Sequence, residues 1–113
     1  MVSQEQLREM ALAMPEAEER ETWGECTFRV RDKIFLMFSP DGEKASVKAT
    51  LDAQDVLVHA DPETFGVAPY TGRFGWIAVQ LASVDPDQMQ MLVAEAWRKT
   101  APKRLVAAFD TEQ

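Results

Sequence analysis

The first hydrophobic pattern in the chain has the period of a helix. Between Leu7 and Met14, apolar side chains recur every three or four residues and form one stripe. Ser3, followed three residues later by a glutamine, fits a capping box, and the proline after Met14 ends the pattern. We therefore expect a helix over residues 3–14, followed by an acidic, solvated connection over residues 15–22.

Three segments then show the patterns of strands. Residues 26–31 and 44–49 alternate between apolar and polar side chains, which is typical of strands with one buried and one exposed face. Residues 34–38 form a continuous apolar run, which is typical of a central strand. Turn residues separate these segments at positions 32–33 and 39–42. Three strands joined by short turns predict an antiparallel meander.

The middle of the chain returns to a helical pattern before one further strand. Residues 52–60 suit a short helix whose buried stripe includes Val56. Residues 61–74 are rich in proline, glycine and aromatic residues and predict a loop, with a short extended piece near residues 65–69. Residues 76–81 alternate again and predict a strand.

Two helices are expected at the end of the chain. Asp85 is suited to the N-cap position and Pro86 to the first helical position. A buried stripe then runs from Met89 to Thr100. Pro102 begins a final, short helix.

The predicted elements form a single domain over residues 1–113. Their order, α-β-β-β-α-(β)β-α-α, lacks the regular alternation of strand and helix that a parallel sheet needs. We expect an α+β fold in which one antiparallel sheet of four to five strands has helices packed on one face. The predicted core comprises Leu7, Met10, Phe28, Val30, Phe35, Val47, Val56, Leu57, Ile77, Val79, Leu92, Val93 and Phe109.

Composition narrows the function classes. The 113 residues are 46% hydrophobic and 27% charged, which is ordinary for a globular domain. A single cysteine and a single histidine exclude an internal disulfide and metal sites built from either residue type. No apolar run approaches the 18 or so residues of a membrane span, and the N-terminus is polar and acidic, unlike a signal peptide. We expect a cytoplasmic protein without a membrane partner.

The net charge of −7 is unevenly distributed along the chain. Residues 1–25 carry a net −5, whereas residues 26–51 carry +2 and residues 97–109 carry +4. An acidic protein is a poor general binder of polyanions, so the arrangement of the two basic blocks in the fold decides which partners are accessible.

No catalytic motif appears in the sequence. Cys26 and His59 are the only pair that offers a nucleophile and a base, and Cys26 falls on the apolar side of a strand, where we expect it to be mostly buried and unreactive. Glu5 and Glu9 place two carboxylates on one helical face, which a solvated surface explains as well as a metal does. We expect no enzyme activity, no catalytic residues, no metal and no cofactor.

The outward positions of the predicted meander suggest an anion site. Arg29, Arg31, Lys44 and Lys48 are all expected on the side of the sheet opposite the core. Four like charges so close together would be relieved by a nucleic acid, a phosphorylated ligand or an acidic partner. A solvated face balanced by nearby acids is the alternative.

The loop before the last strand is the second candidate. It contains Tyr70, Arg73 and Trp76, with glycines on either side of the arginine. Aromatic rings and arginine can stack on bases or organise a pocket. The alternative is a packed turn in which Tyr70 and Trp76 cover the sheet edge.

Several segments together resemble the MmcQ/YjbR family of small bacterial proteins. The resemblance extends from about Gln4 to Phe109 and rests on the order of short motifs: Trp23-Gly24, Phe28-Arg29-Val30, Lys33-Ile34-Phe35, Ala68-Pro69-Tyr70, Gly72-Arg73-Phe74-Gly75-Trp76 and Ala101-Pro102-Lys103-Arg104-Leu105. It implies a frataxin-like or secretion-chaperone-like α+β fold. It also implies DNA binding through exposed loops that act as a double wing.

The expected function is therefore non-enzymatic binding. In the first hypothesis the partner is DNA, bound weakly and in a salt-dependent manner through phosphate contacts from the basic sheet face and the aromatic, glycine-containing loop. In the alternative hypothesis the chain is a protein-interaction or small-anion-binding domain without a nucleic-acid role. We expect a monomer or a weak homodimer in either case.

Overall fold

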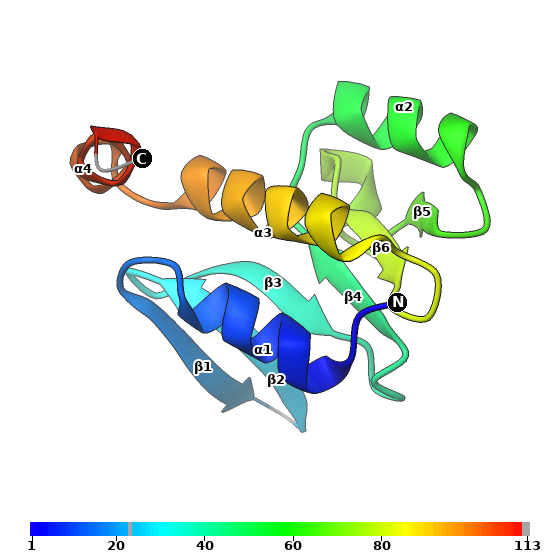
Figure 1. The fold of residues 1–113 in the computed structure, drawn as a ribbon, viewed down its shortest axis with the longest axis horizontal. Coiled ribbons are helices and arrows are strands. Elements are labelled where there is room, and N and C mark those ends of the chain that lie inside the picture. The colour runs from blue at the N-terminus through cyan, green and yellow to red at the C-terminus, as the bar shows by residue number, and fades with distance from the viewer. Residues whose placement is uncertain (23, 112–113) are drawn as a thin grey trace.

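The computed structural model describes residues 1–22 and 24–111. Its elements follow in the order α1 (Gln4–Leu12), β1 (Ala17–Thr22), β2 (Glu25–Val30), β3 (Lys33–Phe38), β4 (Lys44–Val47), α2 (Leu51–Ala60), β5 (Phe65–Val67), the 3₁₀ turn η1 (Gly72–Phe74), β6 (Ile77–Gln80), α3 (Pro86–Thr100) and α4 (Lys103–Thr111). Figure 1 shows their arrangement. None of the helices in the described ranges is long and apolar enough to span a lipid bilayer.

All strands belong to one antiparallel sheet in the order β1-β2-β3-β4-β6-β5. The α+β class is confirmed, but the sheet has six strands rather than four to five. The expected extended piece near residues 65–69 is the edge strand β5. The additional strand is β1, in the segment that we expected to be a solvated connection.

Strand β1 is not predicted from the sequence because its residues, AEERET, do not alternate between apolar and polar side chains. It pairs along its whole length with β2, from Ala17 opposite Val30 to Thr22 opposite Glu25. An edge strand with charged side chains needs no apolar face, and the charges discourage pairing with another chain.

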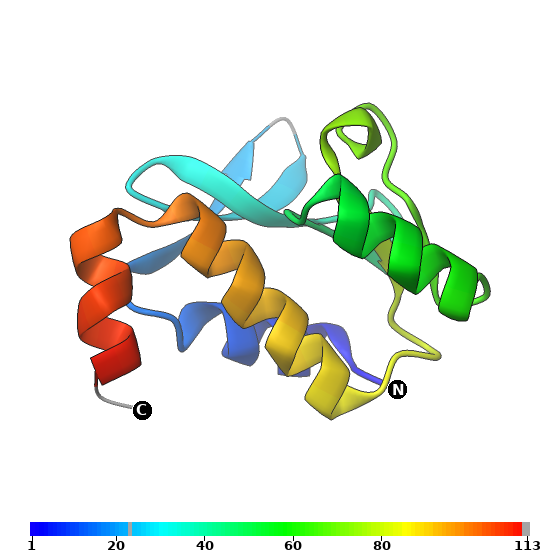
Figure 2. The ribbon, with the colours of Figure 1, turned by 90° about the horizontal axis from the view of Figure 1, so that it is seen from above.

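Helices α1 and α3 lie side by side over one face of the sheet, as Figures 1 and 2 show from two directions. We call this side the covered face and the opposite side the open face. Helix α2 packs at the β5 end of the sheet, and α4 follows α3 beyond its C-terminal end. The N-terminal helix begins as predicted, because Ser3 and Gln6 form both hydrogen bonds of a capping box.

The core fills the space between the covered face and the two helices. It contains eight residues of the predicted set, all buried: Leu7, Phe28, Val30, Phe35, Val47, Ile77, Val79 and Val93. Four others are partly buried and pack against it: Met10, Leu57, Leu92 and Phe109. The prediction for Val56 is wrong, since its side chain is 65% exposed. Helix α2 instead turns Gln54 inward, and Leu57 and Val58 pack beside it.

Strand β3 contains a β-bulge. The register places Phe28 opposite Leu36 and Arg29 opposite Ile34, so that Phe35 has no direct partner on β2. Phe35 and Leu36 are both fully buried although they are adjacent in the strand. The bulge therefore explains why this segment is continuously apolar rather than alternating.

Trp97 joins the last two helices to the rest of the core. Its side chain is fully buried, its Nε1 donates a hydrogen bond to the Pro15 carbonyl at 2.9 Å, and its ring meets Phe109 edge-on at 5.1 Å. The predicted stripe of α3 did not include this residue. It fills the corner where α3, α4 and the end of α1 meet.

Candidate functional site

A row of paired strand positions crosses the open face from one edge of the sheet to the other. The strand register aligns Arg20, Thr27, Met37, Ser46, Ala78 and Gly66 in this row. At the β5 side the members are small, whereas toward β1 they are larger. The sheet surface is therefore low over β4, β6 and β5.

This low surface is the floor of an open hollow of about 700 Å³. The floor contains Met37, Ser46 and Ala78. The remaining lining residues are Glu25, Phe38, Ser39, Pro40, Asp41, Lys44, Pro62, Glu63, Thr64, Phe65, Gly66, Val67, Pro69, Tyr70, Thr71 and Gln80. Ligand pockets typically measure about 300–1,000 Å³, so the hollow has the size of a binding site.

Tyr70 stands at one wall of the hollow in an unusual conformation. Its backbone is left-handed, with φ of 63°, and its side chain is 96% exposed. A bulky residue in this region costs on the order of 1 kcal/mol, and an exposed ring recovers little of that cost by packing. Strained, exposed aromatic residues are more typical of recognition loops than of structural turns.

The Tyr70 loop is held in place from below. The buried amide of Gln54 donates hydrogen bonds to the carbonyls of Gly72, at 2.8 Å, and Trp76, at 2.7 Å. Gly75, with φ of 106°, packs against the start of α2, where an added Cβ would lie 2.6 Å from the backbone of Thr50. These contacts fix the end of the loop that follows Tyr70 against the start of α2.

The rim of the hollow is predominantly acidic. Carboxylates of Glu25, Asp41 and Glu63 line it, together with one amine, that of Lys44. The hydroxyl of Ser39 donates a hydrogen bond to Asp41 at 2.7 Å and thereby lowers the pKa of that carboxyl. Three carboxylates and one amine favour a cationic ligand over an anionic one.

The four cations that we expected on one basic face are dispersed. Lys44 lines the hollow, whereas Lys48 lies about 13 Å further along the strand direction. Arg29 pairs in register with Glu18 on β1 and with Ile34 on β3. Its Nε donates a hydrogen bond to the hydroxyl of Thr27 at 3.2 Å.

Arg31 does not continue the alternation of β2, which ends at Val30. It occupies the turn between β2 and β3 with φ of 51° and forms an ion pair with Glu16 at 2.5 Å. The guanidinium lowers the pKa of the Glu16 carboxyl through this hydrogen bond. The expectation of a single patch built from four basic residues is therefore wrong for Arg31.

The three candidate residues of the aromatic loop do not share one site either. Tyr70 lines the hollow, but Arg73 and Trp76 do not. Trp76 is only 9% exposed and is part of the packed turn. Arg73 is exposed and lies over the ring of Phe74, with 4.7 Å between its Cζ and the ring centroid. Trp23, which belongs to the family motifs, lies outside the described residues.

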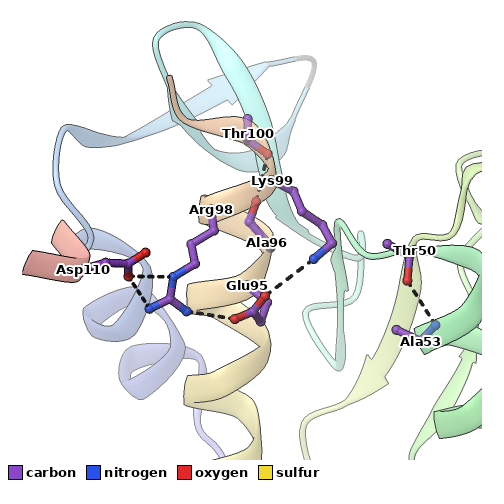
Figure 3. A network of polar contacts seen from close by, with 8 residues as sticks. All are labelled: Thr50, Ala53, Glu95, Ala96, Arg98, Lys99, Thr100 and Asp110. Carbon is purple, nitrogen blue, oxygen red and sulfur yellow. Dashed lines mark hydrogen bonds and ion pairs between the residues drawn. The ribbon is translucent and has the colours of Figure 1, made fainter. Parts of the chain in front are cut away.

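Other basic residues are neutralised by acids close to them. Arg8 pairs with Glu19 at 2.9 Å, on the covered side of β1. In the C-terminal basic block, Arg98 bridges Glu95, at 2.8 Å, and Asp110, at 2.9 Å, and so connects α3 to α4 (Figure 3). Arg98, and Lys99 through its own ion pair with Glu95 at 3.6 Å, therefore have a structural explanation in their own surroundings.

The cysteine is half-buried rather than mostly buried as expected. Its thiol donates a hydrogen bond to Glu19 at 3.0 Å. Burial and this bond raise the pKa of Cys26 to about 11, so the thiol stays protonated at neutral pH. His59 is exposed in the last turn of α2, with Nδ1 2.8 Å from the carbonyl of Asp55. Within residues 1–22 and 24–111, no group of three or more His, Cys, Asp or Glu residues is arranged to hold a metal.

Sequence reasoning missed most of the hollow. Glu25 and Glu63 were counted only in the charge distribution. No site was predicted at the small residues Ser46, Ala78 and Gly66. These three come from three strands, and only the register brings them together. The signal that could have identified the hollow is a set of small outward residues in neighbouring strands. This signal can be recognised only when the strand order is known.

An antiparallel sheet with helices over one face and a hollow in the other defines an α+β domain of simple two-layer architecture. The family model described as YjbR matches residues 12–99, and the chain belongs to the YjbR family. The resemblance found in the sequence motifs is thus confirmed.

Relatives and a solved structure agree with this assignment. Proteins of Mycobacterium tuberculosis and Mycobacterium bovis, both named only as uncharacterized, are 30% identical over 71 residues, which are 62% of this chain and 55% of theirs. The match thus spans about half the length of these curated relatives. A crystallised Deinococcus radiodurans protein with a DUF419 domain superposes with a TM-score of 0.77 at 17% identity, over 86% of this chain and 77% of that one. The latter similarity shows the fold.

Proposed function

We propose that this chain is a non-catalytic binding domain whose ligand site is the hollow on the open face. The observation that carries the proposal is Tyr70, a strained and almost fully exposed aromatic residue that lines the hollow. Backbone hydrogen bonds from Thr71 to the Pro69 carbonyl and from Gly72 to the Ala68 carbonyl close the turn, but the exposed ring contributes little to the packing of the fold. Contact between a ligand and the ring would account for a tyrosine at this strained backbone position.

The placement of the thiol supports binding rather than covalent catalysis. Cys26 belongs to the covered side of β2, because its partner in register is Glu21 and it alternates with Phe28. Its raised pKa keeps it a poor nucleophile. The hollow itself offers apolar contact area, hydroxyl groups and carboxylates, which suit recognition of a ligand.

DNA binding is the second candidate function, and it rests on a different observation. Lys44, Lys48 and Arg73 form no ion pair with any residue of the described ranges, and exposed loops border the open face on two sides. Such loops fit the double-wing idea that the family resemblance implies. Contacts from these three cations and Arg29 to four phosphates predict a slope of about −3.6 for log K against log salt. The net charge of −7 and the acidic rim oppose strong binding.

One experiment separates the two candidates. The ¹⁵N-labelled protein is titrated with duplex DNA, with single-stranded DNA and with a mixture of random hexapeptides, and amide shifts are mapped. For the hollow, we expect peptide-induced shifts at Met37, Ser46 and Ala78 that disappear in Ala78→Trp, which fills the floor. The matched control is Met91→Trp, on an exposed site of α3.

The DNA arm has its own outcomes. If DNA shifts residues near Arg29 and Lys48 at low salt, and the shifts vanish in the Arg29→Glu/Lys48→Glu double variant, the second candidate replaces the first. If neither peptides nor DNA perturb the hollow at millimolar peptide, the proposed site is wrong.

A further inference from the structure

We propose, building on the proposed function of the hollow, that its occupant is an extended, positively charged segment of a partner protein. Three independent features of the hollow lead to this ligand: its charge, its exposed ring and its length. The charge disfavours phosphate ligands, the ring offers a contact for a cation, and the length disfavours a small molecule.

The charge of the rim selects a cation. Glu25 at the start of β2 and Glu63 just before β5 stand on opposite sides of the hollow. Neither forms an ion pair with a residue in the described ranges, in contrast to Glu16, Glu19 and Glu95, which all do. Unpaired carboxylates on two sides of an apolar floor attract lysine or arginine and repel phosphate.

The exposed ring offers a second contact for a cation. Arginines of this protein already lie over Phe38, Phe74 and Phe109 at 4.7 to 5.9 Å. No cation of the described residues lies over Tyr70, and its ring is open to solvent beside the acidic rim. A guanidinium or ammonium group from a ligand can therefore occupy the ring face.

The length of the hollow favours a polypeptide over a small molecule. Its lining runs from Glu25 on β2 across β3, β4 and β6 to Gly66 on β5. Four strand spacings amount to about 19 Å, which is the span of about six extended residues. The segment would cross the strands, with apolar side chains over the floor at Met37 and Ala78 and basic side chains toward the rim.

The test uses three fluorescent ten-residue peptides with the same apolar residues. They differ only in carrying four Lys and Arg, four Gln or four Glu residues, and binding to the whole protein is followed by anisotropy. We expect the basic peptide to bind at least tenfold more tightly than the neutral one. The Glu25→Gln/Glu63→Gln variant should weaken it about threefold to tenfold. The matched control, Glu5→Gln/Glu9→Gln, removes equal charge from α1 and should change nothing.

The ring has its own pair of variants. Tyr70→Phe keeps the aromatic face and should retain the affinity for the basic peptide, whereas Tyr70→Leu keeps apolar bulk without it and should lose about threefold. Equal affinities of the two variants would remove the ring from the proposal.

The remaining outcomes distinguish the inference from the function on which it rests. If all three peptides bind equally and Ala78→Trp abolishes binding, the hollow is a binding site but its selectivity for basic segments is wrong. If the basic peptide binds equally to Ala78→Trp and to the Glu25→Gln/Glu63→Gln variant, it is attracted only by the overall negative charge and the proposal is wrong. If no peptide binds, both the inference and the hollow as a site are refuted.

Discussion

The two faces of the sheet are made from the same strands but differ in burial and in residue type. On β3, Leu36 is fully buried on the covered face, whereas its neighbour Met37 is only partly buried in the hollow of the open face. Over the central strands the covered face is apolar, and it is closed by α1 and α3. The open face combines small residues, unpaired carboxylates and a strained tyrosine.

The difference separates residues that determine the fold from residues that are available for function. Apolar side chains on the covered face have many neighbours, and a change there is transmitted through close-packed surroundings. Side chains over the hollow, such as Met37, are less buried, so they can differ between relatives or ligands at a smaller cost in stability. Substitutions on the covered face should therefore mainly lower stability, whereas substitutions on the open face should have smaller effects on stability and should mainly affect ligand binding.

The largest expected effect comes from adjacent positions on β3. Leu36→Ala should lower the free energy of unfolding by about 2–5 kcal/mol, because it leaves a cavity under α3. Met37→Ala, one residue further on, should cost about 1 kcal/mol or less and should leave the melting temperature close to that of the wild type. Chemical denaturation of both variants measures the difference.

A comparable loss at the two positions would contradict the division between the faces. It would mean that the floor of the hollow is also required for folding. The hollow would then be a defect in packing rather than a site.

The second effect concerns the support of the Tyr70 loop. Gln54→Leu has similar volume but removes both hydrogen bonds to the carbonyls of Gly72 and Trp76, which are then left unsatisfied. We expect a loss of about 2 kcal/mol in the free energy of unfolding, together with shifts in the amide resonances of residues 68–76. If the loop resonances stay unchanged, Gln54 does not position the wall of the hollow.

The covered face was accessible to sequence reasoning because burial leaves a periodic trace. The capping box at Ser3, the meander of three strands and the stripe of α3 from Met89 onward all follow from local patterns, and the structure confirms them. The failures on this side have local causes. Gln54 replaces an apolar residue on the inner face of α2, and β1 carries charges where a strand usually carries apolar residues.

The open face was not accessible in the same way. Lys44 and Tyr70 were selected for their chemical type, and they line the hollow. Arg31 was misplaced because alternation was extended one residue past the end of β2 into the turn. The strand order β4-β6-β5 brings Glu63 to the same hollow as Glu25 and Asp41, and this long-range property is contained in no local pattern.

A smaller effect, of opposite sign, is expected on the open face. Tyr70→Gly removes a side chain that is 96% exposed and relieves the left-handed backbone at φ of 63°. The greater freedom of glycine in the unfolded chain offsets part of this gain. We expect the free energy of unfolding to be unchanged or to rise by up to about 1 kcal/mol, measured by denaturation. A clear loss of stability would show that the ring contributes to packing and that its strain has a structural reason.

The smallest effect tests a polar cluster at the edge of the covered face, where Glu19 on β1 meets Arg8 of α1 and the thiol of Cys26. Hydrogen bonds from Cys26 and Arg8 lower the pKa of Glu19 from its ordinary value of 4.5. A carboxyl whose pKa is lowered by folding stabilises the native state above that ordinary value. The contribution is lost as the pH falls through the lower, folded pKa.

Glu19→Gln should therefore lower the free energy of unfolding at pH 7 by less than about 1 kcal/mol, since both partners are about one-third exposed. Its stability should also fall less steeply than that of the wild type below pH 4.5. Arg8→Met removes the same ion pair from the other side, so the two variants and their combination form a double-mutant cycle. If both single variants keep the acid dependence of the wild type, the cluster is not what secures β1 to α1. The hydrogen-bonded register with β2 would then hold this charged edge strand alone.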